Sequence, residues 1–467
     1  MDDSHNQLVE DLSRQVKDFH ESKTAFLVYH GSTNSTRSLS FKRDQMLDVS
    51  QLNRVLSIDP KKRIAIVEPN VAMDILLDQT LEHGLMPPVV MEFPGITVGG
   101  GIQGGAGESS SFKWGCFNRL SNWHEMILAD GSTIKTSPKD NADLFNGTAG
   151  SYGSLGVLTA SEIKLIPAKK YVRLDYIKVG SYTQAVTKID EIVSNGKYDY
   201  IDGIMFSPNS GTILAGSLCD EAVVPIQRFS RSHDPWFYLH VENMSQKHEI
   251  WSETVPLKDY LFRYDRGAFW TGRYPFERAG IPFNRFTRWM LDPLLHTRKL
   301  YQALQASGAA QQYIVQDMAV SSDKTVEFIE YLAKQLNTFP LWLCPMLPDR
   351  DSPLLCNNID CKQVINVGIW AGTKFANHKA FVEANRMIET ELHRLGGKKW
   401  FYAHSYYTET EFWKIYDKQW YINLRKKYKA DSLPTIYDKI RVKDQPPVNI
   451  RKAALKTIFG LSKLTIK

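Results

Sequence analysis

Apolar residues recur along this chain with two periods, one typical of helices and one typical of strands. Leu8, Leu12, Val16 and Phe19 follow three- and four-residue intervals, which predicts an amphipathic helix. With similar patterns downstream, the predicted helices are residues 7–20, 71–84, 325–335 and 378–395. Short apolar runs bounded by polar or turn residues predict strands at residues 25–29, 63–68, 124–129, 157–166, 201–206, 212–216, 341–344 and 364–369.

The amino-acid composition changes after Pro167. Glycine clusters interrupt the first part, whereas the second part has few of them and many aromatic residues. Strand-like and helical pieces alternate in the second part, and we detect no internal repeat, so we predict an α+β protein. The predicted parts are residues 1–168, residues 169–440 and a tail, residues 441–467.

The most unusual stretch is residues 93–107, FPGITVGGGIQGGAG, in which seven of fifteen residues are glycine. Gly99, Gly101 and Gly104 satisfy the spacing G-x-G-x-x-G of dinucleotide-binding proteins. That motif should follow a strand and open a helix, yet Pro94 and Gly95 lie directly upstream, and the later glycines would weaken a helix start. No Gly-Lys-Ser/Thr follows, so the run is not a P-loop either.

A glycine run still has a physical use. Glycine backbone reaches positive φ angles and approaches a ligand closely, and successive N–H groups then form a concave nest for anionic oxygens. A cofactor that carries a diphosphate is the natural occupant, and a flexible loop is the alternative. A second stretch of small residues, residues 147–159, leads directly into a predicted strand. The two stretches together are more specific than either alone.

Both stretches belong to an ordered set of motifs: PGITVGGGIQGGAGESSSFKWG, LADGS, DLF and GSLGVLT. The set resembles the FAD-binding domain of the vanillyl-alcohol oxidase superfamily, and within it the Δ24-sterol reductase family. The likeness continues in order through EIKLIPAKKYV, VQDMAV, WLCPM, EFWKIYD and YDKI, and covers residues 15–440. It implies a two-lobed FAD-binding domain in residues 1–168 and an α+β substrate or cap domain in residues 169–440, whose last part returns to the flavin.

The resemblance also implies a set of cofactor-binding residues. The first four would pass along the FAD diphosphate, residues 108–110 would lie near the isoalloxazine or ribityl chain, and the last five would form the wall by the adenine half. The alternative for the glycines is turn geometry alone. The full set is Thr97, Val98, Gly99, Gly100, Gly101, Ile102, Gln103, Gly104, Gly105, Ala106, Gly107, Glu108, Ser109, Ser110, Gly150, Ser151, Gly153, Gly156 and Val157.

Two departures from the family pattern matter. Members of this branch often begin with an apolar membrane segment, whereas the N-terminus here is charged throughout. Many superfamily members carry a histidine at the end of the first loop that bonds covalently to the flavin. His30 instead precedes the loop, residues 30–38, so we expect FAD to be bound without a covalent link.

The activity implied by the resemblance is FAD-dependent reduction of an isolated C=C bond in the side chain of a sterol or related terpenoid, with NADPH as donor. A flavin oxidase of the same fold, which dehydrogenates an alcohol or natural product with oxygen, is the first alternative. A non-catalytic, lipid-binding flavoprotein is the second. Fold alone does not separate these, because function resides in the site.

Alkene reduction needs a proton donor, an apolar slot and a face that tolerates positive charge, which aromatic rings provide. Residues 400–407, WFYAHSYY, are rich in rings, and alternation along a strand would place Tyr402, His404 and Tyr406 on one side. His404 is one candidate acid, since imidazolium is populated near neutral pH. Glu242 and Asp317 are others, because burial would raise their pKa values. Each of these three is alternatively a hydrogen-bonded core group, and the two tyrosines are expected to be pocket walls.

Composition narrows the possible partners. Lys and Arg exceed Asp and Glu by 57 to 51 over 467 residues, a surplus too small for a nucleic-acid-binding footprint. The five cysteines are odd in number and scattered, which predicts neither a disulfide framework nor a zinc site and favours a reducing, intracellular compartment. We expect no metal site, and the sequence leaves the oligomeric state open.

Membrane contact is expected only at the C-terminus. No run of about 18 apolar residues exists in the sequence. Residues 448–467, VNIRKAALKTIFGLSKLTIK, contain five basic residues and no acidic one, and their apolar residues cluster on one side of a helix. A basic amphipathic helix lies in the headgroup plane of anionic membranes. We therefore expect a cytoplasmic protein or one bound peripherally to the endoplasmic reticulum.

Overall fold

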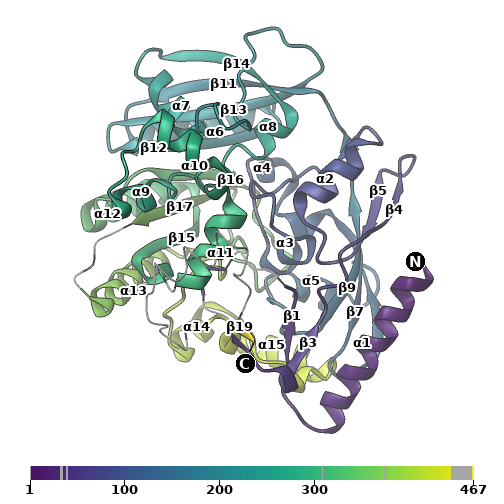
Figure 1. Cartoon of the computed structure of the whole chain (residues 1–467). Helices are drawn as coiled ribbons and strands as arrows, with labels where there is room; N and C mark the ends of the chain where they lie inside the picture. The colour runs from purple at the N-terminus through teal and green to yellow at the C-terminus, as the bar shows by residue number, and fades with distance from the viewer. Residues whose placement is uncertain are drawn as a thin grey trace.

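The chain folds into two lobes, each built on its own β-sheet, as Figure 1 shows for the computed structural model. The structure describes residues 2–31, 35–37, 40–307, 309–372, 375, 377–442 and 465–466. We call the part built on the five-stranded sheet the first lobe and the part built on the eight-stranded sheet the second lobe. Helices and strands are mixed in both, which confirms the predicted α+β class.

The first lobe has a five-stranded antiparallel sheet with the order β4 (Val55–Asp59), β5 (Ile64–Val67), β9 (Val157–Lys164), β7 (Ser121–Ile127) and β8 (Thr133–Thr136). The amphipathic helix predicted at the N-terminus is α1 (Asp3–Glu21). Its His5 is buried and lies between Glu68 and Glu125, at 2.8 and 3.0 Å, which fixes the helix on the sheet. Those two carboxylates raise the pKa of His5 to about 9 against the opposing effect of burial, which lowers it.

Short pieces complete the first lobe. Its helices are α2 (Met73–Leu81), α3 (Val98–Gly104), α4 (Ser111–Trp114) and α5 (Ala142–Thr148). Its two-stranded pairs are β1 (Leu27–Tyr29) with β3 (Met46–Asp48), β6 (Leu85–Met86) with β10 (Ile166–Pro167), and β2 (Ser40–Phe41) with β19 (Thr465–Ile466).

The second lobe has an eight-stranded antiparallel sheet. Its order is β14 (Ile250–Pro256), β11 (Tyr171–Val179), β13 (Ser210–Cys219), β12 (Tyr200–Ser207), β16 (Leu341–Met346), β17 (Val364–Gly372), β15 (Tyr313–Ser321) and β18 (Lys398–Lys399). One face is covered by three helices with an apolar core between: α6 (Tyr182–Asn195), α12 (Ser322–Leu336) and α13 (His378–Arg394).

The other face of this sheet points towards the first lobe. Successive strand residues alternate between faces, so Asp317 of β15 and Trp342 of β16 lie on the inner face together with Asn366 and Trp370 of β17. This face is also covered by helices at the front of the second lobe: α7 (Phe237–Ser245), α8 (Leu257–Leu261), α9 (Arg273–Ala279), α10 (Arg285–Leu291) and α11 (Thr297–Ser307).

The last described helices are α14 (Glu409–Ile415), α15 (Lys418–Lys427) and α16 (Ile436–Ile440). Of these, α14 is joined to α13 by the Arg386–Glu411 ion pair, whereas α15 packs against the first lobe. Arg425 donates to the Ser154 carbonyl at 2.6 Å, and Lys429 pairs with Asp130 at 2.7 Å. These contacts agree with a C-terminal part that returns to the first lobe, while the domain boundaries themselves stay a prediction.

Most predicted elements occur with ends shifted by a few residues. The strand considered for residues 400–407 is absent, which corrects that prediction. β18 ends at Lys399, and the backbone then turns inward, where Thr36 N–H donates to the Tyr402 carbonyl and Gln316 to the His404 carbonyl. The predicted amphipathic tail, residues 448–467, lies outside the described residues except for β19.

Candidate functional site

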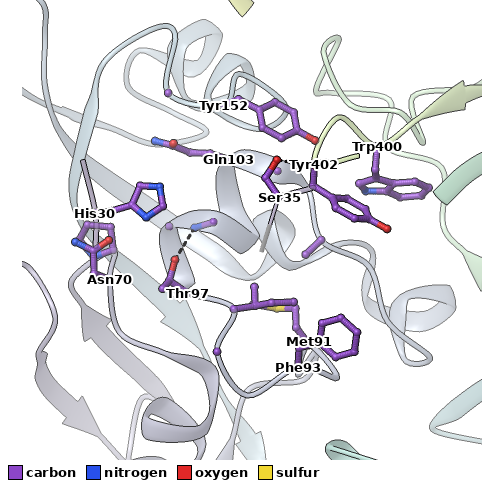
Figure 2. Close-up of a pocket in the computed structure, with 18 of the residues that line it drawn as sticks. His30, Ser35, Asn70, Met91, Phe93, Thr97, Gln103, Tyr152, Trp400 and Tyr402 are labelled. Carbon is purple, nitrogen blue, oxygen red and sulfur yellow. Dashed lines mark hydrogen bonds between the residues drawn. The ribbon is translucent and has the colours of Figure 1, made fainter. Parts of the chain in front are cut away.

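A cavity of about 340 Å³ lies between the two lobes. Figure 2 shows its lining: His30, Asn70, Thr97 and Gln103 on one side, and Phe93, Trp400 and Tyr402 on the other. We call the side formed by α3 and its neighbours the glycine end. We call the side formed by the inner face of the eight-stranded sheet, with Glu92, Phe93 and Tyr301, the aromatic end.

The glycine run forms helix α3 rather than the loop expected from its sequence, which corrects that prediction. Thr97 caps the helix, and its hydroxyl accepts a hydrogen bond from Gly100 N–H at 3.2 Å (Figure 2). Gly105 ends the helix at φ +63°, a left-handed conformation that favours glycine. Within the helix itself no glycine has a positive φ, and close packing explains the residue type only at Gly99 and Gly101.

The glycines of α3 face two ways. A Cβ on Gly99 would lie 2.7 Å from Pro69 Cβ, and one on Gly101 would lie 2.7 Å from the Met91 methyl group, so these two let the helix pack inward. Gly100 and Gly104 line the cavity instead, where a Cβ would meet only Thr97 Oγ1 at 3.1 Å or Tyr152 at 3.8 Å. The space over this second pair is therefore open to a flat or extended ligand.

Two cations line the same end, Arg37, which is buried, and Lys439, which is half-buried. Arg37 and Lys439 both border the cavity, and no carboxylate of the described residues pairs with either. Burial, opposed only by Tyr152, lowers the pKa of Arg37 to about 10, and burial together with Arg37 and Arg425 lowers the pKa of Lys439 to about 8. The Arg37 Nε and His30 Nδ1 atoms are buried without a hydrogen-bond partner. Unpaired cations that are buried or half-buried need an anion, and the diphosphate of FAD would supply one.

The second glycine stretch contributes a sharp turn. Gly153 lines the cavity at φ +74°, and a Cβ there would lie 3.1 Å from Gln103 Oε1 and 3.3 Å from Lys439 Nζ. Gly156 and Val157, at the start of β9, line the cavity as well. The glycine end therefore offers glycine backbone, polar side chains such as His30 and Gln103, and two cations, which fits the diphosphate and adenine half of the expected cofactor.

The aromatic end is walled by packed rings. Phe93 contacts Trp370 edge-on at 5.6 Å between ring centroids and Tyr301 at 6.1 Å. Trp370 stacks on Tyr402 at 6.3 Å, and Trp342 and Met346 complete the wall. Such a lining suits an apolar ligand and provides ring faces that stabilise a nearby positive charge.

A carboxyl group sits inside this apolar wall. Asp317 Oδ2 accepts a hydrogen bond of 2.5 Å from the Tyr402 hydroxyl, and Oδ1 accepts one of 3.0 Å from Asn366. Across the strands Asp317 faces Gly368, where a Cβ would lie only 2.7 Å from Oδ1, so the glycine makes room for the carboxyl group. Burial raises the pKa of Asp317 to about 6, although both hydrogen bonds oppose that rise.

A second carboxyl group, Glu92, also lines the aromatic end and was missed by the sequence analysis. Burial, reinforced by the charges of Glu108 and Asp317, raises the pKa of Glu92 well above its usual value. Glu108 lies behind it, bonded to Ser109 at 2.8 Å and to Arg263 at 3.3 Å. Glu92 therefore borders the cavity as a carboxyl group whose environment disfavours its charged form.

The buried charges behind Glu92 are largely compensated. Arg263 also bonds Asp202 at 3.0 Å, and Asp202 accepts further hydrogen bonds from Tyr264 at 2.7 Å and Trp342 at 3.0 Å. Asp202, Glu108 and Arg263 do not line the cavity. This cluster holds a fixed charge close to the aromatic end without offering a reacting group of its own.

Many residues of the predicted site meet in this cavity. Those that line it are Thr97, Gly99, Gly100, Gln103, Gly104, Ala106, Gly107, Gly153, Gly156, Val157, Asp317 and Tyr402. Those that do not line it are Val98, Gly101, Ile102, Gly105, Glu108, Ser109, Ser110, Gly150, Ser151, Glu242, His404 and Tyr406. Some residues that do not line the cavity hold in place those that do. Val98 and Ile102 are fully buried on the inner face of α3, and Trp400 donates a hydrogen bond to the Gly105 carbonyl.

The structure does not support His404 or Glu242 as the acid. His404 bonds Thr36 at 3.3 Å and stacks parallel to Tyr406 at 6.2 Å, away from the cavity, because the backbone turns where a strand had been expected. Burial and the positive charge of Lys399 lower the pKa of His404 to about 3, so its ring is neutral near pH 7. Glu242 lies on α7, half-buried, outside the cavity lining.

Within the described residues, no helix combines the length and apolarity that crossing a bilayer requires. The same residues contain no group of three or more His, Cys, Asp or Glu side chains arranged to hold a metal ion.

Comparisons with known proteins fit this geometry. A model of the FAD binding domain family matches residues 7–137. The Delta(24)-sterol reductase of Homo sapiens is 31% identical over 446 residues, which cover 93% of this chain and 86% of that protein. The Delta(24)-sterol reductase of Pisum sativum is 28% identical over 460 residues, covering 89% and 80%. Cytokinin dehydrogenase 9 of Oryza sativa subsp. japonica is 30% identical, but over only 30% of this chain.

Proposed function

Because this chain belongs to the Delta(24)-sterol reductase family, we propose that it reduces an isolated C=C bond of the Δ24 type in the side chain of a sterol or related terpenoid. It is an FAD-dependent oxidoreductase that acts on C=C bonds. The proposal concerns the bond reduced, the residues that act on it and the donor.

One observation carries the proposal: a carboxyl group, Glu92, lines the cavity beside the aromatic wall, and its pKa is raised well above the usual value by burial. A carboxylic acid in an apolar site is a poor binder of polar substrates but a suitable proton donor. An alcohol oxidase would instead need a base to take up a proton, and the raised pKa of Glu92 favours its proton-carrying form. The aromatic end therefore favours addition of a proton over its removal.

The residues divide the reaction as follows. Bound FAD, once reduced, supplies the hydride. We assign the proton to Glu92, which would deliver it to the less substituted alkene carbon. Positive charge then develops on the more substituted carbon, where the hydride adds. The Asp317 carboxylate, held by Tyr402 and Asn366, and the ring face of Trp370 would stabilise that charge.

Arg37, Lys439 and the open faces of Gly100 and Gly104 would hold the cofactor. We propose that the link is non-covalent. Acid precipitation should then release the yellow colour into the supernatant, and colour kept in the pellet would contradict the proposal.

NADPH as the electron donor is part of the proposal. Anaerobic mixing with NADPH should bleach the flavin, and incubation with NADPH and a panel of Δ24 sterols should give products heavier by two hydrogens. A flavin that NADPH leaves oxidised, but that oxygen rapidly reoxidises after chemical reduction, would favour the oxidase alternative. A purified protein without flavin would favour the lipid-binding alternative.

The tail, residues 441–467, is proposed as a peripheral contact with the endoplasmic reticulum membrane, on the strength of its basic amphipathic sequence. Deletion of residues 445–467 should weaken co-sedimentation with anionic vesicles and leave FAD content unchanged. Equal sedimentation of both forms would contradict this role.

A further inference from the structure

Helix α10 (Arg285–Leu291) presents its large apolar side chains to solvent. Phe286, Trp289 and Met290 are 64%, 50% and 53% exposed. Their spacing of three and four residues puts them on one helical face, where the Phe286 and Trp289 rings lie 5.8 Å apart. An amphipathic helix on a soluble protein turns such a face inward, so the orientation of α10 is inverted.

The register of the helix is fixed by hydrogen bonds at its start. Asn284 and Thr287 form a reciprocal capping box, and the Thr287 hydroxyl also donates to the Pro282 carbonyl at 2.5 Å. Thr287 is buried, and Leu291 on the same side packs against the core of the second lobe. Since this side is anchored, the three apolar side chains must project outward.

Basic residues border the exposed face. Arg285 is exposed and donates to the His233 carbonyl at 3.4 Å, and Arg288 lies over the Phe283 ring at 4.8 Å. No carboxylate of the described residues pairs with either guanidinium group. The patch therefore combines apolar side chains with uncompensated positive charge. We call Arg285, Phe286, Arg288, Trp289 and Met290 the α10 patch.

The size and the charge of the patch identify its partner. The three apolar side chains expose on the order of 350 Å², given that each would bury roughly 150–250 Å². A stable protein interface needs about 800 Å² on each partner, so a second copy of this protein is a poor fit. Aromatic side chains beside basic ones are instead typical of surfaces that dip into an anionic headgroup layer.

The patch is also connected to the cavity. α10 continues through a short turn into α11 (Thr297–Ser307), whose Tyr301 lines the aromatic end. We propose that the α10 patch is a contact site for an anionic membrane surface. The proposed function supplies only the reason for such a contact, a substrate insoluble in water, and lipid binding can be tested without turnover.

The first test uses the full-length protein and vesicles of phosphatidylcholine with or without phosphatidylserine. Replacing Phe286, Trp289 and Met290 by serine should weaken binding to the anionic vesicles at least tenfold. Ile250→Ser is the matched control, because Ile250 is 69% exposed on β14, away from α10, and should leave binding unchanged. Both variants are also made without residues 445–467, so that the tail cannot mask the loss. Unchanged binding of the triple-serine variant in both backgrounds would overturn the proposal.

A second readout does not depend on how the triple variant folds. Vesicles with acyl chains brominated close to the headgroup quench tryptophans that reach the boundary between the headgroups and the acyl chains, and Trp289→Phe should remove the quenched component of the fluorescence. Equal quenching in the two proteins would overturn the proposal. Light scattering tests the other candidate partner, a second copy of this protein. If the wild type is a dimer, the triple-serine variant is a monomer and vesicle binding is unchanged, the patch is a subunit interface and the proposal is overturned. Sterol turnover in detergent should persist in the triple variant, so a failure of the proposed function would appear in the wild type as well.

Discussion

The two ends of the cavity are lined by different kinds of group. At the glycine end the lining is glycine backbone and polar side chains with two cations, Arg37 and Lys439, that no carboxylate of the described residues pairs with. At the aromatic end it is rings with two carboxyl groups, Glu92 and Asp317. The shape and fixed charge of the glycine end decide which ligand it binds. The protonation states of Glu92 and Asp317 decide which chemistry the aromatic end can perform. Changes at the two ends should therefore fail in different assays.

The largest effect is expected at the glycine end, from Gly100→Val. The side chain would fill the open face of α3, where only Thr97 Oγ1 lies close, so the fold should survive and FAD should be lost. The flavin-to-protein ratio after purification should fall at least tenfold. Gly180→Val is a matched control, since Gly180 is exposed, has a similar nearest contact of 3.3 Å and lies outside the cavity. A variant that keeps stoichiometric FAD would show that α3 is not the cofactor's platform.

The next effect is expected at the aromatic end, from Glu92→Gln. Loss of a general acid costs roughly 10²–10⁴-fold in rate, so alkene reduction by the reduced flavin should slow at least a hundredfold. Reduction of the flavin by NADPH should change less than twofold, because hydride transfer from NADPH to the flavin needs no proton from Glu92. Glu242→Gln is the control, a half-buried carboxyl group outside the cavity, and should behave as the wild type. A normal rate of alkene reduction in Glu92→Gln would rule out this acid.

A smaller effect should appear in the pH dependence. Burial raises the pKa of Asp317 to about 6, so lowering the pH through 6 should protonate it and slow alkene reduction. Asp317→Asn should remove this decrease in rate at low pH, which is the acidic limb of the pH–rate profile, and should lower the maximal rate about tenfold. Tyr402→Phe should move the limb to higher pH, because the Tyr402 hydrogen bond opposes the rise in the pKa of Asp317. A limb that both variants leave in place belongs to another group.

Asp317 also makes a prediction about stability. Its pKa in the folded state is above the unfolded value of about 3.9, so ionisation costs more in the folded protein. The contribution of Asp317 to the free energy of unfolding is fully present below pH 4 and is lost as the pH rises through 6. Asp317→Asn should accordingly not lower the melting temperature above pH 6, and a clear decrease there would contradict the assigned pKa shift.

The smallest effect on chemistry is expected from His404→Ala. His404 is buried beside Tyr406 outside the cavity, so turnover should stay within about twofold while stability falls by about 2 kcal/mol. Thermal unfolding and steady-state rates separate the two outcomes. A large loss of alkene reduction with unchanged melting would restore His404 as a candidate acid.

The glycine end could be predicted from sequence far better than the aromatic end. Its residues lie in two short stretches, 97–107 and 153–157, and each stretch carries a local motif. Even there the helix was missed, because the packing of Gly99 and Gly101 against Pro69 and Met91 depends on tertiary contacts that offset the low helix propensity of glycine.

The aromatic end is assembled from residues far apart in the sequence. Glu92, Asp317 and Tyr402 meet only after the sheet of the second lobe has formed. The only signal for Asp317 was a carboxyl group within an apolar run, and Glu92 gave a similar but weaker signal just before Phe93. The strand expected at residues 400–407 failed because contacts with Thr36 and Gln316 bend the backbone after β18.

Arg37 and Lys439 could not have been paired from the sequence either. They are separated by almost the whole sequence and come together because α16 packs back on the first lobe. A lone Arg after a polar loop and a lone Lys in a short helix are ordinary surface residues in any pattern. Only their position beside the open face of α3 identifies them as partners for an anion.

The central claim is that the aromatic end delivers a proton and the flavin a hydride to an unactivated alkene. A single-turnover experiment tests it most directly: the purified holoenzyme is reduced anaerobically with one equivalent of dithionite and mixed with a Δ24 sterol. The account predicts that the flavin absorbance returns as the sterol is consumed, with one product molecule, two hydrogens heavier, for each flavin reoxidised. A flavin that stays reduced in the presence of the sterol and is reoxidised only when air is admitted would contradict it.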